Sequence, residues 1–331
     1  MINKNCHQKI FGDEFESGSV KSQEDLDAAF SKHPDLSKTY VQTATYWEDY
    51  RDWYEKHWPV VCKCLDQDFL SKFRMESEHT ARAWEFHIAT VLTERGIVLK
   101  EKDWEYGPDF CIQLPTGNNL WIEAIVCDRG TVDPVEPYPD MKPGIIYSFG
   151  GNIEDTHRPR ALRITSAIGT KFEKFKKYLA DSENSGVKDG DCLVIAVNGS
   201  PVQHFARADM LFKRAVFGQG PFTYVKVPGK EKLQGPYFKP TPTIVKKANG
   251  EESEIPANFM EMDEFSKISA VLYCGHSASH SWNNGYSVGD DFMFAYHAKA
   301  DNPIPDNFFT FGTGVRKDID KNEITEFRQA R

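Results

Sequence analysis

Two acidic residues are spaced as they would be on neighbouring strands of a short β-hairpin. Asp109 opens the run DFCIQL, Glu123 lies inside the run LWIEAIV, and the turn-forming segment Pro115–Asn119 separates them. Two converging carboxylates repel each other unless a cation lies between them, and such hard oxygen ligands favour Mg²⁺ or Mn²⁺. A bound ion of this kind polarises a phosphodiester and lowers the pKa of a water molecule. The spacing therefore predicts a divalent-metal site with hydrolytic chemistry.

Glu123 is the sharper indication, because the rest of its strand, Trp121-Ile122-Glu123-Ala124-Ile125-Val126, is apolar. A carboxylate in such surroundings needs a partner, and a metal ion supplies one. Simpler interpretations exist for each residue alone. Asp109 could be a turn residue after Pro108, and Glu123 could point to solvent from an edge strand.

Helices are predicted on both sides of the hairpin. The segment 77–96 has apolar residues at helical spacing, with Ser77 suited to the N-cap and Gly96 to the left-handed C-terminal position. Glu85 lies at the border of its apolar face. A second helix is predicted over 161–180, followed by the apolar strand 191–197. This order, helix–strand–strand–helix–strand, predicts a mixed α/β domain.

The strings Gly107-Pro108-Asp109-Phe110 and Trp121-Ile122-Glu123-Ala124 resemble the signature of the PD-(D/E)xK nucleases, a superfamily that includes restriction, DNA repair and anti-phage nucleases. The resemblance covers about residues 75–200. It implies a restriction-endonuclease-like core, a central mixed sheet flanked by helices, with N-terminal helical and C-terminal additions. It also implies that Asp109 and Glu123 bind Mg²⁺, which Mn²⁺ can replace, and that Glu85 adds a third ligand.

One position departs from that signature. Residue 125 is Ile, where the family has a Lys that orients the attacking water and stabilises developing charge. Some members carry this Lys on the following helix, and Lys171 is the candidate here, because it falls on the apolar face of the segment 161–180. A Lys turned toward a core is unusual unless its ammonium has a use, although a Lys that extends to solvent would also fit. Arg163 is predicted to contact the scissile phosphate.

The resemblance thus predicts a Mg²⁺-dependent endonuclease of the restriction or defence type. Double-stranded DNA is the expected partner, and a homodimer is a further expectation. Two alternatives stay open. Ile125 is compatible with a decayed site on a nucleic-acid-binding module, and an RNA endonuclease could use the same fold.

Three consecutive regions are predicted: an N-terminal helical region over 1–75, the nuclease-like core over 76–215, and a C-terminal extension over 216–331 packed on the same core. Residues 130–160 are rich in Pro and Gly and predict a long loop. The segment 226–247 holds six lysines against one acid, Glu231. It is a candidate surface for a phosphate backbone, with a solvated loop as the alternative.

Composition sets the remaining expectations. The net charge of −9 argues against a nonspecific nucleic-acid coat protein but permits a local basic groove. The seven cysteines contain no CxxC pair and are predicted to be reduced structural thiols, which favours a cytoplasmic location. The longest apolar runs are about six residues, far below the roughly 20 needed to cross a bilayer, so no membrane partner is expected.

Overall fold

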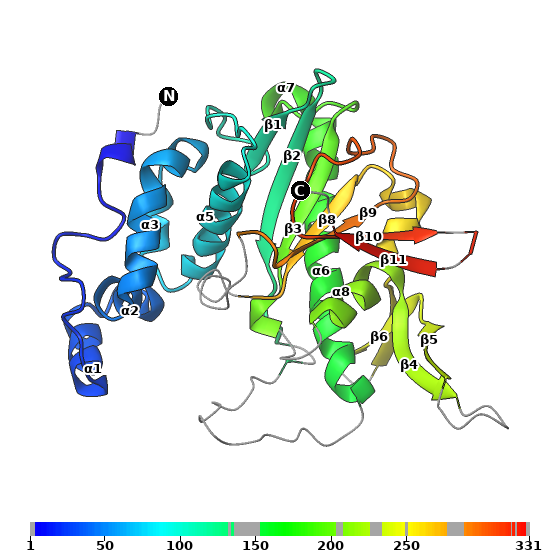
Figure 1. Cartoon of the computed structure of the whole chain (residues 1–331), viewed down its shortest axis with the longest axis horizontal. Helices are drawn as coiled ribbons and strands as arrows, with labels where there is room; N and C mark the ends of the chain where they lie inside the picture. Colours follow the sequence, from blue (N-terminus) through cyan, green and yellow to red (C-terminus); the bar gives the residue numbers. More distant parts are fainter. Residues whose placement is uncertain are drawn as a thin grey trace. The chain divides into compact units, whose positions relative to one another are not determined.

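The computed structural model of the 331-residue chain has α/β architecture (Figure 1). It describes residues 4–131, 134–135, 153–202, 208–225, 234–248, 251–276, 288–318, 320–321 and 323–328. The chain divides into two compact units, which are discontinuous in sequence, whereas the three predicted regions are consecutive segments. The first unit comprises Met1–Ala124, Lys177–Asp191 and Ser277–Gly289, and the second comprises Ile125–Lys176, Cys192–His276 and Asp290–Arg331.

Helices dominate the first unit. They are η1 (Lys4–His7), α1 (Gln23–Lys32), α2 (Lys38–Thr45), α3 (Glu48–Val61), η2 (Cys62–Cys64), α4 (Phe69–Phe73), α5 (His79–Glu94) and α7 (Ser182–Ser185). The aromatic side chains Trp53, Tyr54 and Trp58 of α3 are buried. The ring of Tyr54 lies 5.0 Å from that of Trp53 and 4.8 Å from that of Phe86 on α5, measured between centroids. This aromatic packing fixes α5, which carries Glu85.

Two cysteines of the first unit form a disulfide bond, so the prediction of reduced thiols is wrong for them. Cys6 and Cys62 are 56 residues apart in sequence, and their Cα atoms are 5.5 Å apart. The other five cysteines are buried thiols, as predicted. Because the cytoplasmic prediction rested partly on reduced cysteines, the disulfide removes that support for it.

Loss of this disulfide should lower the free energy of unfolding. By the chain-entropy account, releasing a loop of this length costs about 4 kcal/mol. Urea denaturation of the Cys6→Ser variant should show this loss relative to the native chain. Dithiothreitol should destabilise the native chain and leave the variant unchanged. A reductant effect of equal size in both proteins would contradict the assignment of the stabilisation to this bridge.

The predicted hairpin forms in the first unit. Strands β1 (Phe110–Gln113) and β2 (Asn119–Val126) are antiparallel, with Phe110 opposite Ile122 and Gln113 opposite Asn119. Gly117 allows the tight turn because its φ is 91°, in the region that disfavours a side chain. Asp109 immediately precedes β1 and does not open it, a shift of one residue from the prediction.

The helix before the hairpin, α5, begins later than predicted. Ser77 is not its cap: the N-cap position is Glu78, which makes no side-chain capping hydrogen bond. Gly96 does adopt the expected left-handed conformation, with a φ of 77°. The helical spacing of apolar residues thus located the helix correctly, and only its first turn differs.

A mixed sheet forms the centre of the second unit and confirms the predicted α/β class. Its strands follow the order β3 (Cys192–Asn198), β8 (Ala270–Cys274), β9 (Phe292–Tyr296), β10 (Thr313–Asp318) and β11 (Glu323–Arg328). The pairs β3–β8 and β9–β10 are parallel, and the pairs β8–β9 and β10–β11 are antiparallel. Of these strands, β3 corresponds to the predicted apolar strand 191–197, whereas β10 and β11 were not predicted.

Helix α6 (Ile153–Ala180) starts eight residues before the predicted helix. The predicted loop over 130–160 is therefore wrong for residues 153–160, while residues 132–133 and 136–152 lie outside the described part of the chain. Pro159 misled the prediction, since a proline removes one helical hydrogen bond. Burial of Ala161 and Leu162 helps to hold the helix in place. Its last four residues belong to the first unit.

Smaller elements complete the second unit. They are η3 (Ser200–Val202), α8 (Ala208–Phe217), η4 (Phe259–Glu261), η5 (Asp263–Phe265), the hairpin of β4 (Gln219–Val225) with β5 (Gln234–Pro240), and the hairpin of β6 (Thr243–Ala248) with β7 (Glu251–Pro256). In the described part of the chain, no helix combines the length and apolar character needed to cross a membrane.

Candidate functional site

The hairpin register brings Asp109 and Glu123 together. Phe110 pairs with Ile122, so continuing the register by one residue sets Asp109 opposite Glu123. Directly opposed residues of antiparallel strands project from the same face, with Cβ atoms about 5 Å apart. Oδ2 of Asp109 accepts a hydrogen bond of 2.7 Å from the backbone N–H of Ala124, the residue after Glu123. The Asp109 carboxylate is thereby fixed against the strand that carries Glu123.

Glu123 is fully buried, with 0% of its surface exposed. The simpler interpretation, in which it points to solvent from an edge strand, is therefore wrong. The hydroxyl of Tyr178, itself buried near the end of α6, donates to Oε2 of Glu123 at 3.4 Å. This hydroxyl helps to orient a carboxylate that burial would otherwise disfavour.

Glu85 of α5 is also buried, at 6% exposure. Burial and, after it, the nearby negative charge of Asp109 raise the pKa of the Glu85 carboxyl to about 8, against the opposing effect of Arg82. Arg82 lies one turn earlier on α5 and places Nη1 2.7 Å from Oε2 of Glu85. Two acids that repel each other in a buried setting are the condition that a divalent cation relieves.

A network of charges supports these acids. Arg82 also contacts Asp66, with Nη1 3.3 Å from Oδ2, and Lys102 places Nζ 2.6 Å from Oδ1 of the same carboxylate. Burial acts to raise the pKa of Asp66, but Lys102 and Arg82 together lower it. The positive charge of Lys102 also acts on Glu85. Arg82 and Lys102 are thus held close to the candidate metal ligands by a shared acid.

Sequence reasoning missed these supporting residues. Arg82 had a readable signal, since it stands three residues before Glu85 on the same helix. Tyr178, Asp66 and Lys102 had none, because their approach to the acids depends on tertiary packing.

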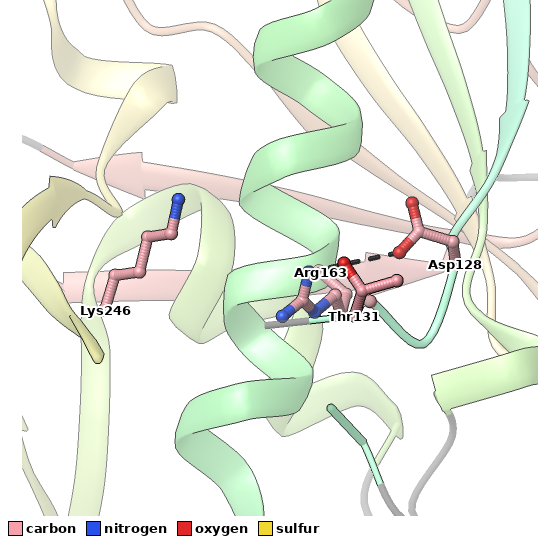
Figure 2. Close-up of a pocket in the computed structure, with 5 residues that line it drawn as sticks. Asp128, Thr131, Arg163 and Lys246 are labelled. Carbon is pink, nitrogen blue, oxygen red and sulfur yellow. Dashed lines mark ion pairs between the residues drawn. The ribbon is translucent and has the colours of Figure 1, made fainter. Parts of the chain in front are cut away.

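Lys171 and Arg163 belong to the second unit, whereas the three acids belong to the first. Lys171 is half-buried on α6. It lies seven residues, about two helical turns, before Tyr178, so both side chains project from the same face of that helix. The approach of Lys171 to the acids stays a prediction. Arg163 lines a cavity of the second unit together with Lys246 (Figure 2).

The predicted basic segment is only partly described. Lys226, Lys230 and Lys232 lie outside the described residues, and so does the side chain of Lys239. Lys246 and Lys247 are described and stand on β6, both exposed. Lys247 pairs with Glu252 at 3.3 Å. Of the predicted basic surface, the structure therefore describes two lysines, and one of them lines the cavity that contains Arg163.

The acids of the first unit offer the donor type that a hard divalent ion prefers, although Glu85, Asp109 and Glu123 do not form a group of three ligand atoms within 4.8 Å of one another. Glu123 on β2, Glu85 on α5 and Asp109 just before β1 offer carboxylate oxygens, the donor type that Mg²⁺ and Mn²⁺ prefer. Comparison with known proteins adds no family assignment, because no family model, curated protein or solved structure matches the chain. The geometry of this acidic group is therefore the basis for a function.

Proposed function

We propose that the chain is a Mg²⁺-dependent endonuclease of the PD-(D/E)xK type that cleaves double-stranded DNA in restriction or defence. One observation carries the proposal: Asp109 stands opposite the buried Glu123 in the hairpin register, and it is close enough to the buried Glu85 to raise the pKa of that carboxyl. Buried acids arranged in this way fit a shared cation better than a structural role.

Each acid has a defined part in this proposal. Asp109 and Glu123 would hold the ion, and Glu85 would add a ligand directly or through water. Arg82 orients the Glu85 carboxylate through its 2.7 Å contact, and Tyr178 orients Glu123 through its hydroxyl. When bound, Mg²⁺ or Mn²⁺ supplies polarisation of the phosphodiester and a more acidic water. The amide of Ala124 keeps the Asp109 carboxylate facing β2.

Lys171 is proposed to take the role of the cation that Ile125 cannot supply. Lys102 acts on Glu85, but its ammonium is bound to Asp66 at 2.6 Å, so its charge is already compensated. Lys171 projects from the same face of α6 as Tyr178, whose hydroxyl reaches Glu123. That shared face supports its assignment to the position that orients water or offsets developing charge.

Replacing Lys171 by Ala should lower kcat about 100-fold, the scale of a lost acid–base or charge-stabilising group. Binding of Mn²⁺, followed by thermal denaturation, should not change. Lys177→Ala is the matched control, because Lys177 is exposed on the same helix. Full activity of the Lys171 variant would contradict only the role of Lys171 and would leave the acidic site untouched.

The experiment that tests the whole proposal is an incubation of purified protein with supercoiled plasmid and with structured RNA. Each substrate is combined with Mg²⁺, Mn²⁺ or EDTA. We expect the plasmid to be cleaved with either metal and to stay intact in EDTA. Cleavage that survives EDTA would contradict the metal mechanism, and cleavage of RNA alone would identify an RNA endonuclease.

Ile125 favours one second candidate, a nucleic-acid-binding module whose catalytic site has decayed. In that case the protein would bind DNA in a gel-shift assay and would cleave neither substrate with either metal. The same incubation therefore separates the two candidates. Sedimentation of the protein with and without DNA would test the proposed homodimer.

A further inference from the structure

The Cys6–Cys62 disulfide lies at one end of a series of contacts that leads to the acidic group. Cys62 begins the short helix η2, and the bridge ties this helix to η1. The carbonyl of Lys63, the middle residue of η2, accepts a hydrogen bond of 2.8 Å from the backbone N–H of Lys102. The bridge therefore restrains, within the first unit, the helix against which Lys102 is held.

Lys102 carries this restraint to the acids. Its Nζ lies 2.6 Å from Oδ1 of Asp66, and Oδ2 of the same carboxylate lies 3.3 Å from Nη1 of Arg82. Nη1 of Arg82 also lies 2.7 Å from Oε2 of the buried Glu85. A continuous path of hydrogen bonds and ion pairs thus joins η2 to a candidate metal ligand, and the disulfide is the element of this path that has two discrete states.

The residues after η1 are held by contacts that do not involve the cysteines. The indole N–H of Trp58 donates to the Gln8 carbonyl at 2.8 Å, and Oε1 of Glu55 accepts from the backbone N–H of Phe11 at 3.0 Å. Phe11 is fully buried. Opening of the bridge therefore releases η1 and its restraint on η2, while the segment that follows stays packed.

A third cysteine, Cys64, lies two residues from Cys62 on η2, and its surroundings keep it out of thiol exchange. Its thiol is buried, and burial raises its pKa to about 11. The nucleophile in thiol–disulfide exchange is the thiolate, of which such a thiol holds very little near neutral pH. Reoxidation therefore restores the original pair.

We propose that the Cys6–Cys62 bond is a redox switch that sets the affinity of the acidic group for a divalent cation, with the oxidised form binding more tightly. In the reduced form, binding of the ion must also order η2 and Lys102, and this ordering lowers the affinity. The cation as the ligand rests on the proposed function, whereas the effect of the bond on Lys102 does not.

A dithiol is the reductant of this switch. Its first thiolate attacks Sγ of Cys6, which is partly exposed, and displaces the thiolate of the buried Cys62. Its second thiolate attacks the mixed disulfide and displaces the thiolate of Cys6. The reagent leaves as a cyclic disulfide, and its two thiol protons end on the two cysteines.

Hydrogen–deuterium exchange in EDTA tests the structural part of the proposal without metal. Reduction by dithiothreitol should speed exchange of the Lys102 amide about 10-fold, because its acceptor on η2 loses a restraint. The Cys6→Ser variant should exchange at the faster rate with or without reductant. Cys64→Ser is the matched control, since it keeps the bridge and should respond as the native protein does. An unchanged Lys102 rate on reduction would overturn the proposal.

Titration calorimetry with Mn²⁺ tests the coupling to the acids. The protein is reduced with dithiothreitol, which is then removed under nitrogen before the titration. The Kd for Mn²⁺ should be about 10-fold higher in the reduced protein than in the oxidised one. Asp66→Asn interrupts the path beyond Lys102 and should abolish this difference.

The outcomes separate the switch from the proposed function. An equal Kd in both redox states would overturn the switch alone, and a full difference in Asp66→Asn would overturn the path. If Mn²⁺ binds in neither state, the switch falls together with the metal site. If binding depends on the bridge but DNA is not cleaved, the switch stands and the proposed nuclease fails.

Discussion

Replacing Asp109 by Asn should lower the rate of DNA cleavage about 1,000-fold, because a ligand that positions a catalytic ion accounts for several kcal/mol of transition-state stabilisation. Asn keeps the shape of the side chain, and its Oδ1 can still accept the hydrogen bond from the Ala124 amide. The substitution therefore removes the negative charge with little disturbance of the hairpin. Initial rates of plasmid nicking in Mg²⁺ give the measurement.

A measurement of metal binding and a control variant make this result specific to the metal site. Mn²⁺ should raise the Tm of the native protein, since a ligand that binds only the folded state stabilises it, and this rise should be lost in the Asp109 variant. Asp103→Asn is the control, because Asp103 is an exposed acid in the segment that leads into β1. Activity of the Asp109 variant within about threefold of the native rate would exclude a metal-binding role for this residue.

Replacing Glu85 by Gln should stabilise the metal-free protein at alkaline pH. Burial and the charge of Asp109 raise the pKa of Glu85 to about 8, well above its unfolded value of 4.5. Holding this carboxyl ionised in the folded state is therefore unfavourable. Arg82 keeps its contact with Asp66 at 3.3 Å after the substitution, so no buried cation is left alone. We expect a gain of about 2 kcal/mol, or about 4 °C in Tm.

The sign of the pH dependence follows from the raised pKa. An acid whose folded-state pKa exceeds its unfolded value costs no stability below the unfolded pKa and costs increasingly more as pH rises to the folded pKa. The native protein and Glu85→Gln should thus have the same Tm near pH 4.5 and the full difference above about pH 8. Melting curves in EDTA across this range give the measurement. A variant that is less stable at pH 8.5 would show that the Arg82 contact outweighs the repulsion.

The elements around the acidic group could be predicted from local sequence signals. Apolar residues at helical spacing located α5, and the short apolar runs that follow it located β1, β2 and β3. Gly96 and Gly117 do adopt the backbone conformations that only glycine takes easily. Strands β10 and β11 were missed because polar residues dominate them. In β11, four of the six residues are polar (Glu323, Thr325, Glu326 and Arg328), and all six are partly or fully exposed. A strand with so little buried surface has no strong apolar pattern.

The other features of the site depend on contacts between residues that are far apart in the sequence. Cys6 and Cys62 are 56 residues apart, and a single sequence gives no means of choosing that pair among seven cysteines. Likewise, Asp66 and Lys102 approach Glu85 only after the chain has packed. Glu85, Asp109 and Glu123 could be selected in advance because their local patterns and the family resemblance agreed, whereas the cations that surround them could not.

In strand β6, the burial of Ile244 and the position of Lys246 at the cavity both depend on the same alternation of side chains. Ile244 and Lys246 share one face, which packs on α6 and lines the cavity, while Lys247 projects from the other face. Inserting or deleting one residue in this strand would exchange the faces, exposing the isoleucine and turning Lys247 inward. Length changes in this hairpin are therefore tolerable only in steps of two, whereas conservative exchanges at single positions leave the alternation intact.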